Sequence, residues 1–311
     1  MKRFITVVFI ILVLALLATV GMRVLSREET GEALSIQDLF SGSELHDNGK
    51  TYSKKSVKNI LLIGVDTSNE DFEGASSDSI ILLSIDDKGE RLILSSFMRD
   101  TYLTLPGEDE PSKLYTAIQK GGPEYLEETL EYYFGAEIEN WALVNFEAFR
   151  NIIDTLGGID LQLTDSEAMR AEVTGEDLID AASGTYHLSG RQALKYCRDR
   201  SSSLGSDYDR TARQRTVIGT VWAKIKELPV TQQAKMALDI MEYIKTDMPK
   251  TEMVSYATKI SSYRDYEMVS QRIPIDGTSN AYFLNEKMAI VEMEIEPNRA
   301  YLLESIYGIK E

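Results

Sequence analysis

The chain is poor in residues on which many enzymes depend. Its 311 residues include one cysteine and two histidines, and 50 acidic against 33 basic side chains give it a formal net charge of −17. A single cysteine, Cys197, excludes an intrachain disulfide, which is typical of an exported protein of Gram-positive type rather than a disulfide-stabilised animal ectodomain. Neither His46 nor His187 lies in a spacing typical of a metal site or a catalytic triad. We expect Cys197 and His187 to have packing or turn roles.

Four common catalytic signatures are missing as well: G-x-S-x-G, the P-loop, H-E-x-x-H and C-x-x-C. Their absence argues against serine hydrolysis, nucleotide hydrolysis by a Walker loop and zinc catalysis of these types. The acidic balance and the lack of a long basic arm argue against a nucleic-acid partner.

One long hydrophobic run stands at the N-terminus. Residues 4–22 form nineteen uncharged positions, enough for a helix that approaches the roughly 30 Å hydrocarbon thickness of a bilayer. Basic residues 2 and 3 precede the run, so the positive-inside rule predicts a cytoplasmic tip at residues 1–3 and a single-pass anchor at 4–22. Residues 23–57 are predicted to form a juxtamembrane stalk, and residues 58–311 an extracellular domain. A cleaved signal peptide is the alternative, but the run is long for one and no clear A-x-A site follows.

The exported part has the pattern of an α/β domain. The apolar runs at 58–66, 79–86 and 91–98 predict buried strands, and each delivers charged residues at or near its end. Helical segments follow, one beginning at Pro123 and ending at Gly135. Because strands and helices then alternate, the sequence predicts a three-layer α/β/α sandwich with a central mixed sheet, preceded by one transmembrane helix.

Arginines gather in one stretch of this acidic protein, YCRDRSSSLGSDYDRTARQR at 196–215. The stretch is short and interrupted by aspartates, which favours a small anionic ligand over a nucleic acid. It holds Arg198, Arg200, Arg210, Arg213 and Arg215.

The helix after Asp207 supports this interpretation. Its apolar face, with Ile218 and Trp222, continues towards the N-terminus as Gln214 and Thr211, with Arg210 at its edge. Such side chains are rarely buried without partners, so a bound anion is one explanation. A structural salt bridge from this helix to Asp66, Asp78 or Asp100 is the other.

Two carboxylates near strand ends, Asp66 and Asp78, form a candidate site for a hard cation. Mg²⁺ typically takes one or two carboxylates together with phosphate oxygens of a substrate. Arginines supply bidentate contacts to the same phosphates.

Several blocks of the sequence resemble a known family. NILLIGVD, SSD, SFMRDTYLTLPG, KLYTAIQKGGPEYLEETLEYYFG, VNFEAFRNIIDTLGGIDLQL, GTYHLSGRQALKYCRDR and DYDRTARQR follow in order the signature blocks of LytR-CpsA-Psr proteins, over roughly residues 58 to 260. Members of this family move a glycopolymer, of the teichoic acid or capsular polysaccharide type, from a polyprenyl-pyrophosphate carrier to peptidoglycan. The resemblance therefore implies a phosphotransferase of cell-wall assembly that forms a phosphodiester link at the outer face of the cytoplasmic membrane.

The resemblance also implies roles for individual residues. Asp66 and Asp78 would hold Mg²⁺, with Mn²⁺ as an alternative, and Asp207 would accept the proton of the attacking sugar hydroxyl. The side chains implied to surround the pyrophosphate are Arg99, Arg198, Arg200, Arg210 and Gln214.

The sequence departs from the family pattern at three positions. Ser76 stands where an arginine usually precedes the second aspartate, which removes one expected phosphate contact. Met98 replaces a common proline and Cys197 a small residue, both expected to be tolerated. Ser76 keeps an alternative open, a protein that binds or hydrolyses polyprenyl-pyrophosphate lipids without productive transfer.

Overall fold

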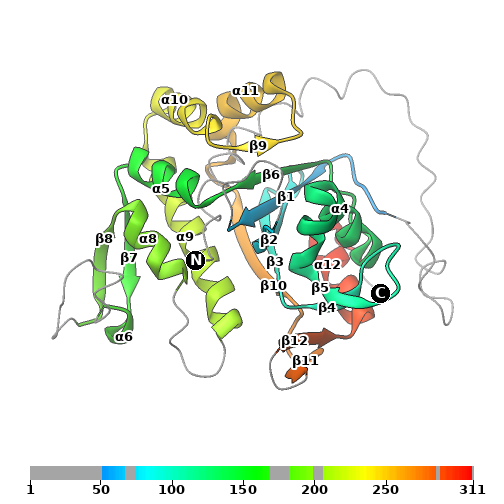
Figure 1. Cartoon of the computed structure of the whole chain (residues 1–311). Coiled ribbons are helices and arrows are strands. Elements are labelled where there is room, and N and C mark those ends of the chain that lie inside the picture. The colour runs from blue at the N-terminus through cyan, green and yellow to red at the C-terminus, as the bar shows by residue number, and fades with distance from the viewer. Residues whose placement is uncertain (1–50, 67–73, 169–181, 199–205, 285–287, 310–311) are drawn as a thin grey trace.

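A mixed six-stranded sheet forms the centre of the computed structural model, which describes residues 51–66, 74–168, 182–198, 206–284 and 288–309. The strand order is β10-β3-β2-β1-β6-β9 (Figure 1). Strand β2 runs antiparallel to both β1 and β3, whereas β6 is parallel to β1 and β10 is parallel to β3. The strands are β1 (Val57–Val65), β2 (Ser77–Asp86), β3 (Arg91–Phe97), β6 (Asn140–Val144), β9 (Lys245–Thr246) and β10 (Glu267–Ile273).

The central strands are buried on both faces, which explains their continuous apolar sequences. All ten residues of β2 are buried, as are eight of the nine in β1. Alternate residues of each strand point into two separate hydrophobic cores, Leu62 into one and Leu61 into the other.

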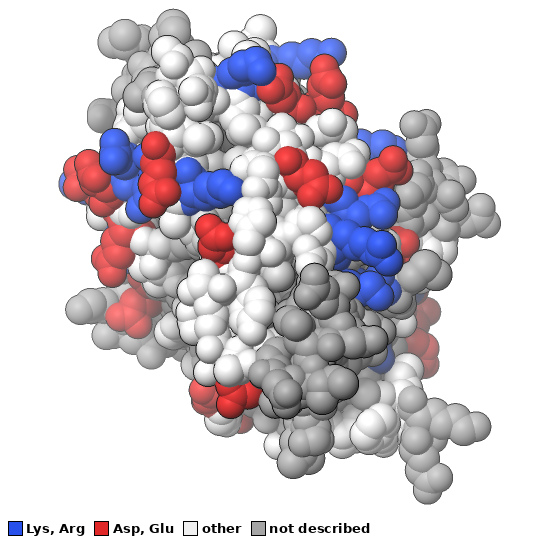
Figure 2. Space-filling model, turned by 90° about the vertical axis from the view of Figure 1, so that its left-hand side faces the viewer, with Lys and Arg blue, Asp and Glu red and all other residues white. Residues whose placement is uncertain are grey.

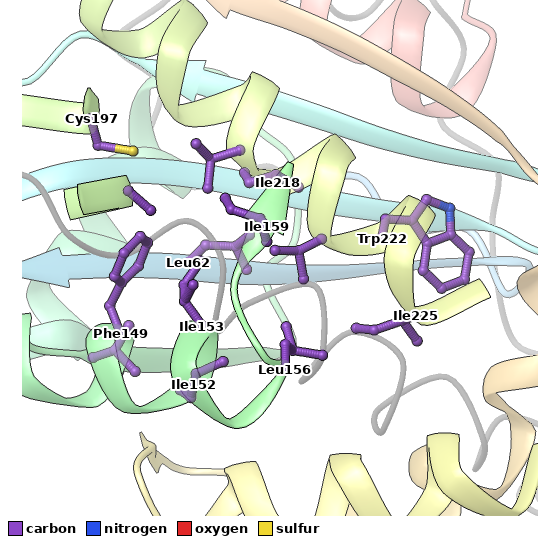
Figure 3. Packing of buried hydrophobic residues seen from close by; sticks show 14 of the residues in the cluster. Leu62, Phe149, Ile152, Ile153, Leu156, Ile159, Cys197, Ile218, Trp222 and Ile225 are labelled. Atoms are coloured by element: carbon purple, nitrogen blue, oxygen red, sulfur yellow. The ribbon is translucent and has the colours of Figure 1, made fainter. Parts of the chain in front are cut away.

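One core lies between the sheet and helices α5 (Phe146–Thr155), α8 (Gly190–Arg198) and α9 (Ser206–Glu227). Figure 3 shows Ile218, Trp222 and Ile225 of α9 in this cluster together with residues of α5 and the sheet. Cys197 belongs to the same cluster and is 1% exposed, which agrees with its expected packing role. Helices α10 (Val230–Met241) and α11 (Lys250–Lys259) lie beyond α5, next to β9.

The second core lies between the opposite face of the sheet and helices α4 (Ala117–Phe134) and α12 (Ile295–Tyr307). Helix α4 is two helical pieces joined at Gly121 and Gly122, and Pro123 begins the second piece as predicted. Gly135 ends it in the left-handed conformation, φ 68°. With helices on both faces of a mixed sheet, the predicted three-layer architecture is confirmed.

Smaller elements complete the chain. Three two-stranded hairpins project from the sandwich, and Figure 1 places the β7–β8 hairpin beside α8 and the β11–β12 hairpin beyond β4 and β5. Their strands and the short helices are β4 (Tyr102–Thr104), β5 (Pro111–Lys113), β7 (Ile159–Leu163), β8 (Gly184–Leu188), β11 (Ser279–Leu284), β12 (Met288–Met293), α6 (Asp165–Ala168), η1 (Leu114–Thr116) and η2 (Ile260–Tyr263).

The folded domain includes residues that the sequence assigned to the stalk. Val57 begins β1 and is 2% exposed, and the Tyr52 amide donates a 2.6 Å hydrogen bond to the Gly135 carbonyl. No helix in the described ranges is long and apolar enough to cross a membrane. The predicted anchor at residues 4–22 lies outside these ranges and stays a prediction.

Candidate active site at one end of the central sheet

The directions of the strands bring the expected site residues to one end of the sheet. Strands β1, β3, β6 and β10 all end there, and β2 begins there because it runs antiparallel to β1 and β3. Asp66 follows β1, Asp78 is the second residue of β2, and Arg99 follows β3 by two residues. Residues far apart in sequence thus meet at one edge of the sheet.

An irregularity in the β1–β2 pairing positions Asp78. Gly64 pairs with Ser79 and the next residue, Val65, pairs with Ser77, so Asp78 is the extra residue of a bulge. Bulges re-aim side chains and are common beside active sites. Across the strands, the Asp66 carboxylate accepts a 2.7 Å hydrogen bond from the Ser76 amide, which fixes it next to the start of β2.

Arg99 forms a buried ion pair with Asp78. The Nη1 atom of Arg99 donates to Oδ1 of Asp78, and the two side chains are 9% and 0% exposed. The Arg99 Nε atom also lies 3.7 Å from Asp100 Oδ2, and Lys113 Nζ lies 2.9 Å from Asp100 Oδ1. Arg99 and Lys113 both face the Tyr115 ring, at 5.0 Å and 5.8 Å from its centroid. The guanidinium is therefore held on two sides by carboxylates and packed against an aromatic ring.

Helix α9 brings a second group of polar side chains to Asp78. The Nη2 atom of Arg210 donates a 3.3 Å hydrogen bond to the main-chain carbonyl of Asp78. Gln214, one turn later on the same face, has a buried side-chain nitrogen with no hydrogen-bond partner among the described residues. Arg210 and Gln214 are each 1% exposed, so Arg210 lies fully inside rather than at the edge of the apolar face.

The sequence left open whether the polar start of this helix, with Arg210, serves a bound anion or a structural salt bridge to Asp66, Asp78 or Asp100. Arg99 forms salt bridges with Asp78 and Asp100, whereas Arg210 reaches the carbonyl of Asp78 rather than its carboxylate. The Arg213 Nη1 atom lies 3.7 Å from Glu167 Oε1. Among the described residues, Arg99 and Arg213 therefore take part in salt bridges within the protein, and Arg210 donates to a main-chain carbonyl.

Arg198 reaches the same end of the sheet from α8. Its guanidinium carbon lies 5.0 Å from the centroid of the Phe146 ring. Phe146 is the first residue of α5, directly after β6 and the N-cap Asn145, whose side chain accepts hydrogen bonds from two amides of the helix start. Arg200 and the side chain of Asp207 lie outside the described parts of the chain, so their roles stay predictions.

The environment of Ser76 differs from the sequence-based expectation. Lys113, the next basic residue in sequence after Arg99, binds Asp100 and so does not take the place of the expected arginine. Gln119 of α4 donates a 3.5 Å hydrogen bond from its Nε2 atom to Ser76 Oγ. Gln119 and Tyr115 both stand in the block KLYTAIQK, where no motif in the sequence points to a role for either.

The carboxylates fit a hard cation only in part. Asp66 and Asp78 offer oxygen ligands of the kind Mg²⁺ prefers. In the described ranges no group of three or more acidic, histidine or cysteine side chains is arranged to hold a metal ion. Two carboxylates, one of them already paired with Arg99, leave most coordination positions to be filled by other oxygens, which suits a metal brought together with a phosphate ligand.

Figure 2 shows acidic and basic side chains interspersed over the face that carries β7, β8 and α5. His187 lies in this region and forms an exposed 2.7 Å contact with Asp160 across the β7–β8 hairpin. It has no part in the site.

Comparison with known proteins identifies the family of the chain. The LytR_cpsA_psr family model matches residues 24–297. The chain belongs to the LytR-CpsA-Psr family. Its curated relatives in this family include the polyisoprenyl-teichoic acid–peptidoglycan teichoic acid transferase TagU of Enterococcus faecalis, 26% identical over 95% of this chain and 97% of the relative. TagU of Oceanobacillus iheyensis is 31% identical over 69% of this chain and 66% of the relative, and TagV of Bacillus subtilis 27% over 79% and 64%.

Solved structures of the LytR-CpsA-Psr family share the fold. TagT bound to LI-WTA superposes with a TM-score of 0.65 at 20% identity, covering 85% of this chain and 96% of that one. TagV of B. subtilis superposes with a TM-score of 0.63 at 23% identity, covering 82% and 98%. At these identities the likeness supports the mixed α/β architecture alone.

Proposed function

We propose that the protein is a cell-wall phosphotransferase that moves a glycopolymer of the teichoic acid type from a polyprenyl-pyrophosphate lipid to peptidoglycan. The family membership and the names of the relatives support the reaction class. In this proposal the pyrophosphate binds at the end of the sheet beside Asp78, and the reaction requires Mg²⁺.

The buried amide of Gln214 carries the proposal. A donor left without an acceptor inside a protein costs free energy, so natural structures rarely keep one unless a ligand or water completes it. Gln214 stands one turn from Arg210, whose guanidinium donates to the Asp78 carbonyl. The Asp78 carboxylate in turn pairs with Arg99. A pyrophosphate oxygen is an acceptor that matches this set of donors.

The proposed transfer reaction gives each of the candidate side chains a role. A sugar hydroxyl of peptidoglycan attacks the phosphorus that carries the glycan, the bond from that phosphorus to the bridging oxygen breaks, and polyprenyl phosphate leaves. Arg99, Arg198 and Arg210 bind the phosphate oxygens and stabilise charge that develops on the leaving group. Asp207 accepts the hydroxyl proton. Mg²⁺ held by Asp66 and Asp78 would neutralise phosphate charge when bound.

The proposal places the enzyme at the outer surface of the cytoplasmic membrane, held by the predicted anchor at residues 4–22. The lipid carrier has its tail in the same bilayer, so the anchor keeps enzyme and substrate together.

The test is a product-resolved assay. We would incubate the full chain with lipid-linked glycopolymer, Mg²⁺ and peptidoglycan oligomers, and compare wild type with Gln214→Leu and with Thr216→Ala, an exposed residue of the same helix. Linked product from wild type and Thr216→Ala, lowered about tenfold or more in Gln214→Leu, is the expected result. Free hydrolysed glycan or unchanged substrate with wild type would contradict transfer and favour the hydrolysing or lipid-binding alternative.

A further inference from the structure

A second pair of arginines lies beside the candidate site, one strand farther along the sheet. Arg272 stands near the end of β10, the neighbour of β3, and pairs with Ser96, three residues before Arg99. Its Nη1 atom is 3.6 Å from the sulfur of Met98, the residue that precedes Arg99. Arg272 therefore extends the row of charged residues at this end of the sheet.

Arg215 approaches Arg272 from α9. At 3.6 residues per turn, Arg215 and Tyr208 lie on one face of the helix, about 140° around the axis from Arg210. The Tyr208 ring lies 4.1 Å from the guanidinium carbon of Arg272, which shows that this face of α9 meets β10. One helix thus presents two sets of cationic or polar groups, one to β2 and one to β10.

The Arg215 side chain has no carboxylate bonded to it among the residues that the structure describes. It is partly buried, its Nη1 atom is inaccessible to solvent, and that atom has no hydrogen-bond partner in the described parts of the chain. Burial, and then the positive charge of Arg272, lower the pKa of Arg215 to about 10. The structure thus holds two cations close together at a cost in folding stability.

Among the described residues, one carboxylate is bonded to this pair. Asp276 Oδ1 lies 2.5 Å from Arg272 Nη2, and the Asp276 side chain is 95% exposed. An ion pair with such an exposed partner contributes little and is readily exchanged for another anion. The Arg272 side chain is itself 14% exposed, so a solute can reach Arg272 from outside.

We propose that Arg215 and Arg272, with Tyr208 supporting Arg272, form a second anion subsite that binds a phosphodiester of the glycopolymer. This inference rests on the proposed function and specifies its substrate class. The pyrophosphate occupies the Asp78 site, and a phosphate farther along the transferred chain reaches the arginine pair at the neighbouring strand. The enzyme therefore favours polymers with phosphate in the backbone, of the teichoic acid kind, over neutral polysaccharides.

Binding of soluble probes tests the subsite independently of transfer. With the full chain purified in detergent, calorimetry would measure a synthetic glycerol phosphate oligomer and a neutral oligosaccharide of equal length. We expect the oligomer to bind, the neutral compound not to bind, and Arg215→Met or Arg272→Met to weaken oligomer binding about tenfold each. Lys235→Gln, the same charge change on exposed Lys235 of α10, leaves the affinity unchanged.

Thermal unfolding separates a ligand site from a structural role. Methionine keeps much of the length of arginine and removes the charge, so Arg215→Met should raise the Tm of the free protein while it weakens oligomer binding. A lower Tm together with unchanged oligomer affinity would show that Arg215 is structural and would overturn the proposal.

Other outcomes have equally definite meanings. Equal binding of the neutral oligosaccharide, or unchanged oligomer affinity in both methionine variants, overturns the subsite. If the two variants lose binding to phosphatidylglycerol in mixed micelles but keep binding to the oligomer, the anion is a lipid headgroup and the polymer assignment is wrong. Oligomer binding without transfer would contradict the proposed function alone, and transfer without oligomer binding would contradict this inference alone.

Discussion

At the scale of single residues, Asp66 and Asp78 play unequal parts although the sequence treats them as a pair. Asp66 is partly exposed and accepts a hydrogen bond from the Ser76 amide, whereas Asp78 is 1% exposed and bonded to Arg99. The ion pair means that Asp78 holds the site together in addition to any metal that it binds.

Asparagine substitutions should separate these roles. Asp66→Asn is expected to abolish Mg²⁺-dependent binding of the pyrophosphate lipid with little change in stability. Asp78→Asn should abolish it too and also destabilise the protein by about 3–5 kcal/mol, because it leaves the buried Arg99 charge without that carboxylate. Calorimetry and urea unfolding of both variants measure the two effects, and equal unfolding free energies for the two variants would refute the distinction.

Ser76, which replaces an arginine of the family pattern, is closely packed in the structure. Its 4% exposure and the contact with Gln119 leave little room for a larger side chain. We expect Ser76→Arg alone to lower the Tm through overpacking, and Ser76→Arg with Gln119→Ala to recover stability and raise lipid affinity roughly tenfold. Lipid titration and thermal unfolding of the single and double variants check this. Higher affinity at an unchanged Tm in the single variant would show that the loop accommodates arginine freely.

At the scale of elements, α4 carries an unusual concentration of carboxylates beside β6 and β9. Burial, and then the negative charges of Glu131 and Asp247, raise the pKa of Glu127 from 4.5 to about 7. The folded protein therefore keeps a proton that the unfolded chain releases between these pH values. The contribution of this proton on Glu127 to the stability of the folded state is complete below about pH 4.5 and is lost as the pH rises to about 7.

A neutral substitution on α4 makes this visible. Glu127→Gln should raise the Tm relative to wild type at pH 8, and the difference should shrink at pH 5, where the folded wild type already holds the proton. Glu304→Gln, an exposed position on α12, is the matched control and should show no such pH dependence. A Tm difference that is constant across this range would contradict the raised pKa.

At the scale of the whole molecule, the sandwich exists because a sheet buried on both faces needs a helical layer on each. The site lies where one layer, through α9, meets the end of that sheet. The predicted anchor at residues 4–22 would decide on which side of a membrane this site works.

Protease added to intact protoplasts tests that topology. The predicted cytoplasmic tip and single span place the domain outside, so the protease should remove it while a cytoplasmic marker protein stays intact. Protection of the domain until lysis would show that the predicted orientation is wrong.

The sequence by itself determined what depends on local pattern. Continuous apolar runs predicted the buried strands, the punctuation at Pro123 and Gly135 predicted the second piece of α4, and the stripe ending in Gln214 predicted a polar inward end of α9. The ordered blocks of the LytR-CpsA-Psr pattern located Arg99 and Arg210. These signals suffice because burial, helix termini and motif spacing are written along the chain.

Only the tertiary structure decided how these side chains are shared among partners. The Asp66–Ser76 hydrogen bond, the bulge at Asp78, its ion pair with Arg99 and the contact of Gln119 with Ser76 join residues 10 to 43 positions apart, across strands and layers. The tertiary structure likewise decides the neighbours of the arginines on α9. Arg210 donates to the Asp78 carbonyl, Arg213 lies near Glu167, and Arg215 lies near Arg272. A charged side chain takes whichever partner the packing brings within a few ångströms, and no pattern along one chain segment records that distance.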